Sequence, residues 1–435
     1  MNRLVTAWLL VSILSLAGVS AFEPIYERAP INYFETEPDT KLTRLFAEAE
    51  ERGILSEGSD REILHELLEL LEVPVESQIL VFSKTSAQNS RISPRTPRAV
   101  YFSDDAYIGW VQGGEMEAVS FDKKLGVVFH LIELTSREEG KPPKLARDRS
   151  CLNCHAGSSN GGMPGVMVRS VYPQESGLPL FQAGSFHTRQ DSPIDERWGG
   201  WYVTGEVEEC SHLGNTLAEA EGRSAEMTLK PLSTEPVDSL DGFFNTEPYL
   251  NGGRSDVLAL MMLEHQVGVH NILVEANLTT QNALYRHREM QKAFGEPLDA
   301  PLSETNVRIL DRLAEKVLKQ MLYVDEFALP GGVEGGEAFQ TAFQANERKS
   351  DEGRSLKDFR LYERLMKYRC SHLIYSEAFA DLPDAIRPQI LEKLHSILTE
   401  PTAWPDFAHL SESERGHILT ILTETLPDLP EVWAR

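Results

Sequence analysis

Two cysteines and one histidine lie within five residues of each other in this 435-residue chain, in the order Cys151-Leu152-Asn153-Cys154-His155. Two thiols at this spacing, followed at once by an imidazole, form the attachment motif of c-type haem. The thiols can form thioethers with the two vinyl groups at one edge of the porphyrin, and the imidazole can coordinate the iron. The motif therefore predicts one covalently bound haem c, attached at Cys151 and Cys154, with His155 as the proximal iron ligand.

The same pair of cysteines has two other interpretations. A C-x-x-C pair also occurs as a redox-active dithiol or as half of a zinc site. The sequence has no second C-x-x-C pair to complete a zinc site, and it begins with the features of an exported protein. A positive start at 1–3, an apolar run over 4–19 and the small residues of Val19-Ser20-Ala21 predict a signal peptide over 1–21. We therefore expect a bacterial periplasmic protein, in the compartment where haem is attached, with no membrane span after cleavage.

The group at the sixth coordination position of the iron decides which chemistry such a haem performs. A side chain at this position favours electron transfer, whereas an open position lets the iron bind a small ligand. The candidate side-chain ligands are His265 and His212 first, then His270, His187, Met163 and Met167. The apolar sequence around His265 and His270 also fits a buried helix whose imidazoles are hydrogen-bonded and do not reach the iron. A sixth position without a side-chain ligand is therefore the alternative.

An aromatic and basic run, Arg197-Trp198-Gly199-Gly200-Trp201-Tyr202, supplies two further candidates for cofactor binding. An arginine near a haem can donate two hydrogen bonds to a propionate. A tryptophan can pack against the edge of the macrocycle. Arg197 and Trp198 are therefore candidate haem-binding residues, and the competing interpretation is an aromatic strand of the core with a surface arginine.

Cys210 and Cys370 are the two cysteines outside the motif. In an oxidising compartment two remaining cysteines most simply form a disulfide, which would here join the middle of the chain to its C-terminal half. Both occur as Cys-Ser-His, with His212 and His372 as the histidines. A Cys₂His₂ metal site is the alternative, although this spacing is unlike that of common zinc loops.

The five-residue motif resembles the haem-binding box of c-type cytochromes. This resemblance implies a mono-haem cytochrome of the bacterial periplasm. The wider runs at 169–173 and 197–205 resemble large bacterial proteins with a cytochrome-c domain, and that likeness implies no particular reaction. The chain departs from small cytochromes, because Pro142-Pro143 disfavours a long helix leading into the box and more than half of the chain follows it.

Hydrophobic periodicity predicts an α+β fold, with a β-rich haem-bearing region followed by an all-helical C-terminal half. After the signal peptide we expect a helical segment over 22–97, the β-rich haem region over 98–215, a linker over 216–253 and a helical domain over 254–435. A hairpin is expected around 174–177. Strands are predicted over 99–102, 107–111, 118–121, 127–134 and 200–207, and helices over 40–52, 60–71, 257–292, 306–323, 356–368, 385–398 and 411–425.

Composition limits the partners. There are 42 Lys and Arg against 67 Asp and Glu, a formal net charge of −25, which excludes a nucleic-acid-coating role because phosphate contacts need clustered cations. Such a surface suits a basic redox partner protein through electrostatic steering. We expect a cytochrome of periplasmic electron transfer. The alternatives are a haem-dependent oxidoreductase of peroxidase or oxygenase type with an open sixth position, and a haem-based ligand-binding or sensor protein.

Overall fold

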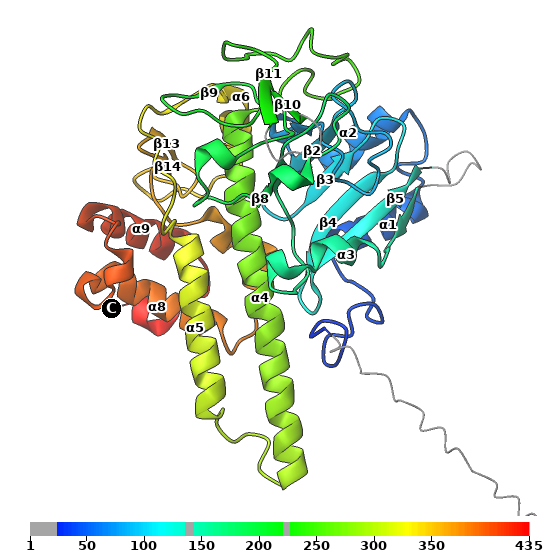
Figure 1. The fold of residues 1–435 in the computed structure, drawn as a ribbon. Coiled ribbons are helices and arrows are strands. Elements are labelled where there is room, and N and C mark those ends of the chain that lie inside the picture. The colour runs from blue at the N-terminus through cyan, green and yellow to red at the C-terminus, as the bar shows by residue number, and fades with distance from the viewer. Residues whose placement is uncertain (1–23, 135–142, 221–226, 435) are drawn as a thin grey trace, which may run out of the picture.

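The computed structural model describes residues 24–134, 143–220 and 227–434. The predicted signal peptide over 1–21 lies outside the described residues. A β-sheet with two short helices forms one side of the molecule, and long helices form the other (Figure 1). The fold is therefore α+β, as the sequence predicts.

The sheet has six antiparallel strands in which each strand pairs with the next in the sequence. Alternating apolar residues and short polar turns made four of these strands predictable, and the structure confirms them. The strands of this sheet are β1 (Ile79–Val81), β2 (Arg98–Phe102), β3 (Tyr107–Trp110), β4 (Met116–Asp122), β5 (Gly126–Glu133) and β6 (Lys144–Ala146). Because β1 belongs to this sheet, the predicted helical segment over 22–97 contributes one strand to the β-rich region.

Both faces of the sheet are covered. On one face the helices α1 (Lys41–Arg52) and α2 (Asp60–Leu70) share a buried cluster with Ile108 and Ile132 of the sheet. Each helix begins at a hydroxyl cap, Thr40 or Ser59, which explains why its start was recognisable in the sequence. The opposite face packs against a single long helix of the C-terminal half.

That helix is α4 (Val257–Phe294), and it forms the centre of the molecule (Figure 1). Asp256 caps its first turn and Gly295, in a left-handed conformation, ends it. Among the described residues α4 alone is long and apolar enough to cross a membrane, but 94% of its apolar window is buried inside the protein. Its continuous hydrophobicity is thus explained by burial on nearly all sides.

Most of the remaining helices pack beside α4 around a hydrophobic cluster of their own. In this layer α5 (Glu304–Met321) lies against α4 and α8 (Arg387–Thr399), α8 contacts α9 (Glu412–Thr425), and the short α7 (Glu377–Ala380) adds Phe379. The helix α6 (Glu337–Gln344) instead buries its phenylalanines in the cluster between α4 and the sheet. Of these helices, α5, α8 and α9 lie where the apolar periodicity places them.

The C-terminal half is not entirely helical, which corrects one prediction. The segment predicted as a helix over 356–368 forms the hairpin of β13 (Phe359–Tyr362) and β14 (Arg364–Met366). Leu361 and Glu363 adopt positive φ angles in it, which no helix interior allows. A further strand, β12 (Val333–Glu334), pairs with β9 (Glu206–Val207).

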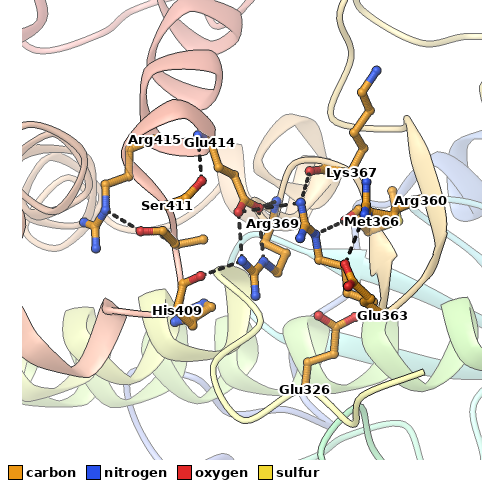
Figure 2. A network of polar contacts seen from close by, with 12 residues as sticks. Glu326, Arg360, Glu363, Met366, Lys367, Arg369, His409, Ser411, Glu414 and Arg415 are labelled. Atoms are coloured by element: carbon orange, nitrogen blue, oxygen red, sulfur yellow. Dashed lines mark hydrogen bonds and ion pairs between the residues drawn. The ribbon is translucent and has the colours of Figure 1, made fainter. Parts of the chain in front are cut away.

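A buried carboxylate attaches this hairpin to the last long helix. Glu414 of α9 accepts hydrogen bonds from the backbone N–H and the guanidinium of Arg369, and that guanidinium also donates to the carbonyl of His409 (Figure 2). Burial opposes the charge of Glu414, but the paired arginine lowers its pKa below the usual range. A carboxylate with this many donors stays ionised and fixes the hairpin.

The predicted linker over 216–253 is also folded. It contains the hairpin of β10 (Thr216–Ala220) and β11 (Met227–Pro231), and its Leu240 and Tyr249 are buried in the cluster on the α1–α2 face. Large apolar side chains that reach the core make this segment part of the domain. The hairpin expected around 174–177 is present, with β7 (Arg169–Val171) paired to β8 (Ser185–His187).

Candidate functional site

The cysteine and histidine motif forms a helix of its own, α3 (Cys151–His155), which follows β6 at one edge of the sheet (Figure 1). From the sequence, this motif was expected only to lie within the β-rich region over 98–215. Both motif thiols are free; Cys151 is half-buried and Cys154 is exposed. One helical turn presents residues three apart on the same side, so both thiols are available to one bound group.

The imidazole of His155 is held by the loop that follows it. Its Nδ1 lies 2.9 Å from the carbonyl oxygen of Gly165, and a carbonyl can only accept, so Nδ1 carries the proton. The ring packs on Phe129 of β5, with centroids 4.3 Å apart. Burial lowers the pKa of His155 below its ordinary value, which keeps the ring neutral. The Nε2 lone pair is thereby the free ligand atom of this residue.

Asn271 of α4 fixes the loop that carries Gly165. Its amide accepts from the N–H of Val166 at 2.9 Å and donates to the carbonyl of the same residue at 2.8 Å. A Cβ atom at Gly165 would lie 2.7 Å from the Asn271 oxygen, so this position needs glycine. Neither role is visible in the sequence, because the clamp joins residues 105 positions apart.

An ion pair lies beside His155 on the same face of the sheet. Glu117 of β4 pairs with Arg98 of β2, and the side chain of each residue is 24% exposed. The guanidinium passes over Gly109 of β3, where a Cβ atom would lie 2.5 Å from its terminal nitrogen. Both charges act on the pKa of His155, the arginine lowering it and the glutamate raising it. The Nε of Arg98 is buried with no hydrogen-bond partner.

These residues fit a covalent haem. Cys151 and Cys154 would form the thioethers, the free Nε2 of His155 would ligate the iron, and the unpartnered Nε of Arg98 would suit a propionate. The donor set matches because the imidazole is neutral and its other nitrogen is already hydrogen-bonded. A haem bound here would supply one-electron chemistry between ferric and ferrous iron.

Arg197 does not lie free for a propionate, which corrects a prediction. Its side chain is only 2% exposed and donates to the Glu264 carboxylate of α4 at 2.8 Å. It also donates to the carbonyls of Gln190 and Ser192. The indole of Trp198 is fully buried beside it in the core. Both residues therefore hold the segment after β8 against α4.

His265 is not available to an iron atom either. Its Nδ1 lies 2.6 Å from Gln190 Oε1 and its Nε2 lies 2.8 Å from Ser371 Oγ, so both nitrogens are occupied. The ring stacks on Tyr323 with centroids 4.0 Å apart and planes 5° from parallel. Of the two interpretations of this histidine, the structure supports the hydrogen-bonded core residue.

His270 and His212 also have partners in the core. His270 lies 2.6 Å from the Tyr107 hydroxyl and 3.0 Å from the Asp104 carbonyl, which uses both of its nitrogens. His212 accepts from the N–H of Gly214 at Nδ1 and packs on the buried indole of Trp198. Burial lowers the pKa of His212 to about 4 and that of His270 to about 3, so both stay neutral.

The three weaker ligand candidates meet at a cavity of about 390 Å³. Met163 and Met167 lie in the loop that follows the motif, and His187 ends β8. The opposite walls come from α4 and α5. The structure thus brings these three residues together beside the loop that carries Gly165, although the sequence favoured them least.

Cys210 and Cys370 do not form the predicted disulfide: both are free thiols. Cys370 is buried in the cluster of the C-terminal helices, whereas Cys210 lies against the cluster on the α4 side of the sheet. The two cysteines thus belong to different hydrophobic clusters. Within the described part of the chain, no group of three or more His, Cys, Asp or Glu side chains is arranged to hold a metal ion, so the Cys₂His₂ alternative has no support.

Sequence reasoning missed a second buried polar group around Asp104, which follows β2. Its carboxylate lies 2.9 Å from Lys357 Nζ and 3.2 Å from His372 Nε2. Burial alone would raise the pKa of Asp104, but its neighbours His372 and Lys357 lower it far below the usual range. Such a group joins the sheet to the C-terminal half, and only its turn position after a strand was visible in the sequence.

Comparison with known proteins gives no relative from which a role could be taken: no family model, no curated protein and no solved structure matches this chain.

Proposed function

We propose that this protein is an exported mono-haem c-type cytochrome that transfers electrons in the bacterial periplasm. The observation that carries the proposal is the state of His155: its Nδ1 is bound to the Gly165 carbonyl, next to two free thiols on one helical turn. A neutral imidazole with a fixed ring and one free nitrogen is what an iron ligand needs. The signal peptide predicted over 1–21 would take the chain to the compartment where haem is attached.

The residues around the motif have defined tasks in this proposal. Asn271 and Gly165 orient the imidazole, and Phe129 supports its ring. Arg98 and Glu117 place a pair of opposite charges beside the haem, where they tune its potential. Removal of Arg3 with the signal peptide makes the net charge of −25 more negative by one, so a partner with a basic surface would associate fastest.

A second function, a haem oxidoreductase with an open sixth position, is favoured by one specific observation. Both nitrogens of His265 and of His270 are hydrogen-bonded in the core, which removes two of the six candidate ligands. An iron without a second side-chain ligand binds small molecules. The cavity beside the loop that follows the motif, at Met163 and Met167, gives such a molecule a place to bind.

The attachment experiment compares the periplasmically expressed wild type with two variants, each of which carries two cysteine substitutions. On a denaturing gel stained for haem, the wild type is expected to be positive and Cys151→Ala with Cys154→Ala negative. The matched control is Cys210→Ala with Cys370→Ala, which changes the other two cysteines and is expected to stay positive. A positive signal from the first pair would refute attachment at the motif.

Carbon monoxide separates the two functions. Ferrous haem with two side-chain ligands keeps its spectrum under carbon monoxide, as electron transfer requires, whereas an open position gives a shifted spectrum. An unchanged spectrum supports the electron-transfer proposal. A shift would overturn it in favour of the oxidoreductase or the sensor.

A further inference from the structure

The end of the α4–α5 hairpin projects beyond the rest of the molecule as a helical arm (Figure 1). The arm comprises residues 285–309, which are the end of α4, the connecting loop and the start of α5. The loop is fixed, because the buried amide of Gln291 donates to the carbonyl of Pro297 at 2.9 Å. Leu302 packs against the cluster of the C-terminal helices. The arm therefore presents a surface of defined shape.

Exposed apolar side chains are concentrated on this arm. Among the described residues the three most exposed large apolar side chains are Phe294 at 72%, Met290 at 59% and Leu298 at 58%. Met290 and Phe294 are four residues apart and therefore share one face of α4. Val307 and Ile309 of α5 are exposed as well. A group of apolar side chains on the surface of a soluble protein marks a site of interaction.

The arm is electrically neutral in a strongly acidic protein. It contains four Lys and Arg and four Asp and Glu, whereas the whole chain has a net charge of −25. Two copies of the chain repel each other through this net charge. The arm is a part of the surface at which two copies can approach without adding to that repulsion.

The charges of the arm are segregated along its length. Glu289 and Lys292 pair with each other at 2.7 Å, whereas the other six have no ion-pair partner within the described part of the chain. These six residues are all exposed, with three carboxylates at the tip and three arginines nearer to the body: Glu296, Asp299 and Glu304, and Arg286, Arg288 and Arg308. The arginines of α4 lie about 12 Å along the helix axis from its end.

Two arms that pack side by side in opposite directions match this pattern. The tip carboxylates of each copy then face the arginines of the other copy. A two-fold axis makes both contacts at once, because the same surface is used by both copies. Met290 and Phe294 lie between the two groups of charges, so they meet at the centre of a four-helix contact. Arms packed in the same direction would instead place like charges opposite each other, which is unfavourable.

From these observations we propose that two copies of this chain associate through an antiparallel contact of their arms, which covers Met290, Phe294 and Leu298. A membrane surface fits the arm less well, because Glu296 and Asp299 would have to approach the anionic headgroups beside these apolar side chains. Such a dimer goes beyond the proposed function and requires no haem.

Sedimentation equilibrium of the periplasmically expressed protein tests the association. The wild type is expected to form a reversible dimer. Met290→Ser with Phe294→Ser should raise its dissociation constant at least about thirtyfold, the effect of losing side chains at the centre of an interface. The matched control is Leu178→Ser with Phe181→Ser, which removes two apolar side chains of similar exposure, 52% and 53%, between β7 and β8. Its dissociation constant should equal that of the wild type.

A charge exchange tests the direction of the arms. Glu296→Lys with Asp299→Lys places cations opposite the arginines of the other copy and should weaken the dimer at least about tenfold. Adding Arg286→Glu and Arg288→Glu to the same chain restores opposite charges across an antiparallel contact, so the dimer should regain most of its stability. Continued weakness in the fourfold variant would refute the antiparallel contact.

Other results would overturn the dimer itself. These are a wild type that stays monomeric up to about 100 μM, and equal weakening by the control pair. Flotation with vesicles of phosphatidylethanolamine and phosphatidylglycerol by a monomeric wild type, lost in Phe294→Ser, would make a membrane the occupant instead. All substituted residues are exposed, so circular dichroism of each variant should match the wild type. Haem content is measured on the same samples, and a dimer without haem would refute only the electron-transfer proposal.

Discussion

Replacing Arg197 by methionine tests whether this arginine stabilises the core or serves the haem. Its guanidinium donates to the Glu264 carboxylate and to the carbonyls of Gln190 and Ser192, with almost no exposure to solvent. Arg197→Met removes these donors and leaves Glu264 buried and ionised, or forces it to take up a proton. Burial already raises the pKa of Glu264 in the presence of the arginine.

The expected cost is about 3–5 kcal/mol in the free energy of unfolding, the usual result of removing one partner of a buried ion pair. This is a large share of the roughly 5–15 kcal/mol that holds a typical domain folded. The double variant Arg197→Met, Glu264→Leu leaves no unpaired charge behind. We therefore expect it to be more stable than Arg197→Met alone, even though it carries one change more.

The assay is urea unfolding at pH 7, followed by circular dichroism, with the haem spectrum recorded on the folded samples. The control is Arg189→Met, which changes an exposed arginine of the same segment and should cost less than about 0.5 kcal/mol. A loss below about 1 kcal/mol for Arg197→Met would refute the buried ion pair. An altered haem spectrum in the folded variant would restore Arg197 as a haem-binding residue.

Three further results are expected. Burial raises the pKa of Asp105 to about 7, so the folded state keeps a proton that the unfolded state releases near pH 4. The free energy of unfolding should therefore fall as the pH rises from 4 to 7. Asp105→Asn should reduce this fall, measured as urea midpoints, and an unchanged pH profile would contradict the raised pKa. Burial lowers the pKa of His130 to about 4, so stability is lost as the pH falls from about 6.5 through 4. Both of its ring nitrogens lack hydrogen-bond partners, so His130→Leu should raise the free energy of unfolding at pH 7 by about 1–3 kcal/mol and reduce its loss in acid. A less stable variant would show that the imidazole has a partner in the folded protein. Iodoacetamide should label Cys210 in the folded holoprotein and Cys370 only after unfolding, because burial raises the pKa of Cys370 to about 12. A disulfide-linked peptide that contains both cysteines would refute the free thiols.

The elements that could be predicted from the sequence are those whose pattern is local. The strands from Arg98 to Glu133 alternate apolar and polar residues between short turns, and α1 and α2 begin at hydroxyl caps. The α+β class followed from these patterns. The helix expected over 356–368 was wrong because its apolar spacing also fits a hairpin, and the positive φ angles of Leu361 and Glu363 have no sequence signal.

The site was predictable only as far as its residues are adjacent. The motif from Cys151 to His155 is continuous, so its chemistry could be read directly. The partners of Arg197 and His265 lie 67 and 106 residues away, at Glu264 and Ser371. No local pattern reveals such contacts, so the sequence left both residues open between a role at the haem and a place in the core. For the same reason no local pattern singles out Asn271, whose partner Val166 lies 105 residues away.

The central claim is that the motif carries one covalent haem with His155 as its ligand. Trypsin cleaves after Arg149 and Arg169, so both motif cysteines and His155 fall in the single peptide 150–169. Mass spectrometry of the unfolded, digested periplasmic protein should find this peptide with the added mass of one haem. An unmodified peptide 150–169 from protein expressed with the haem-attachment system present would contradict the account.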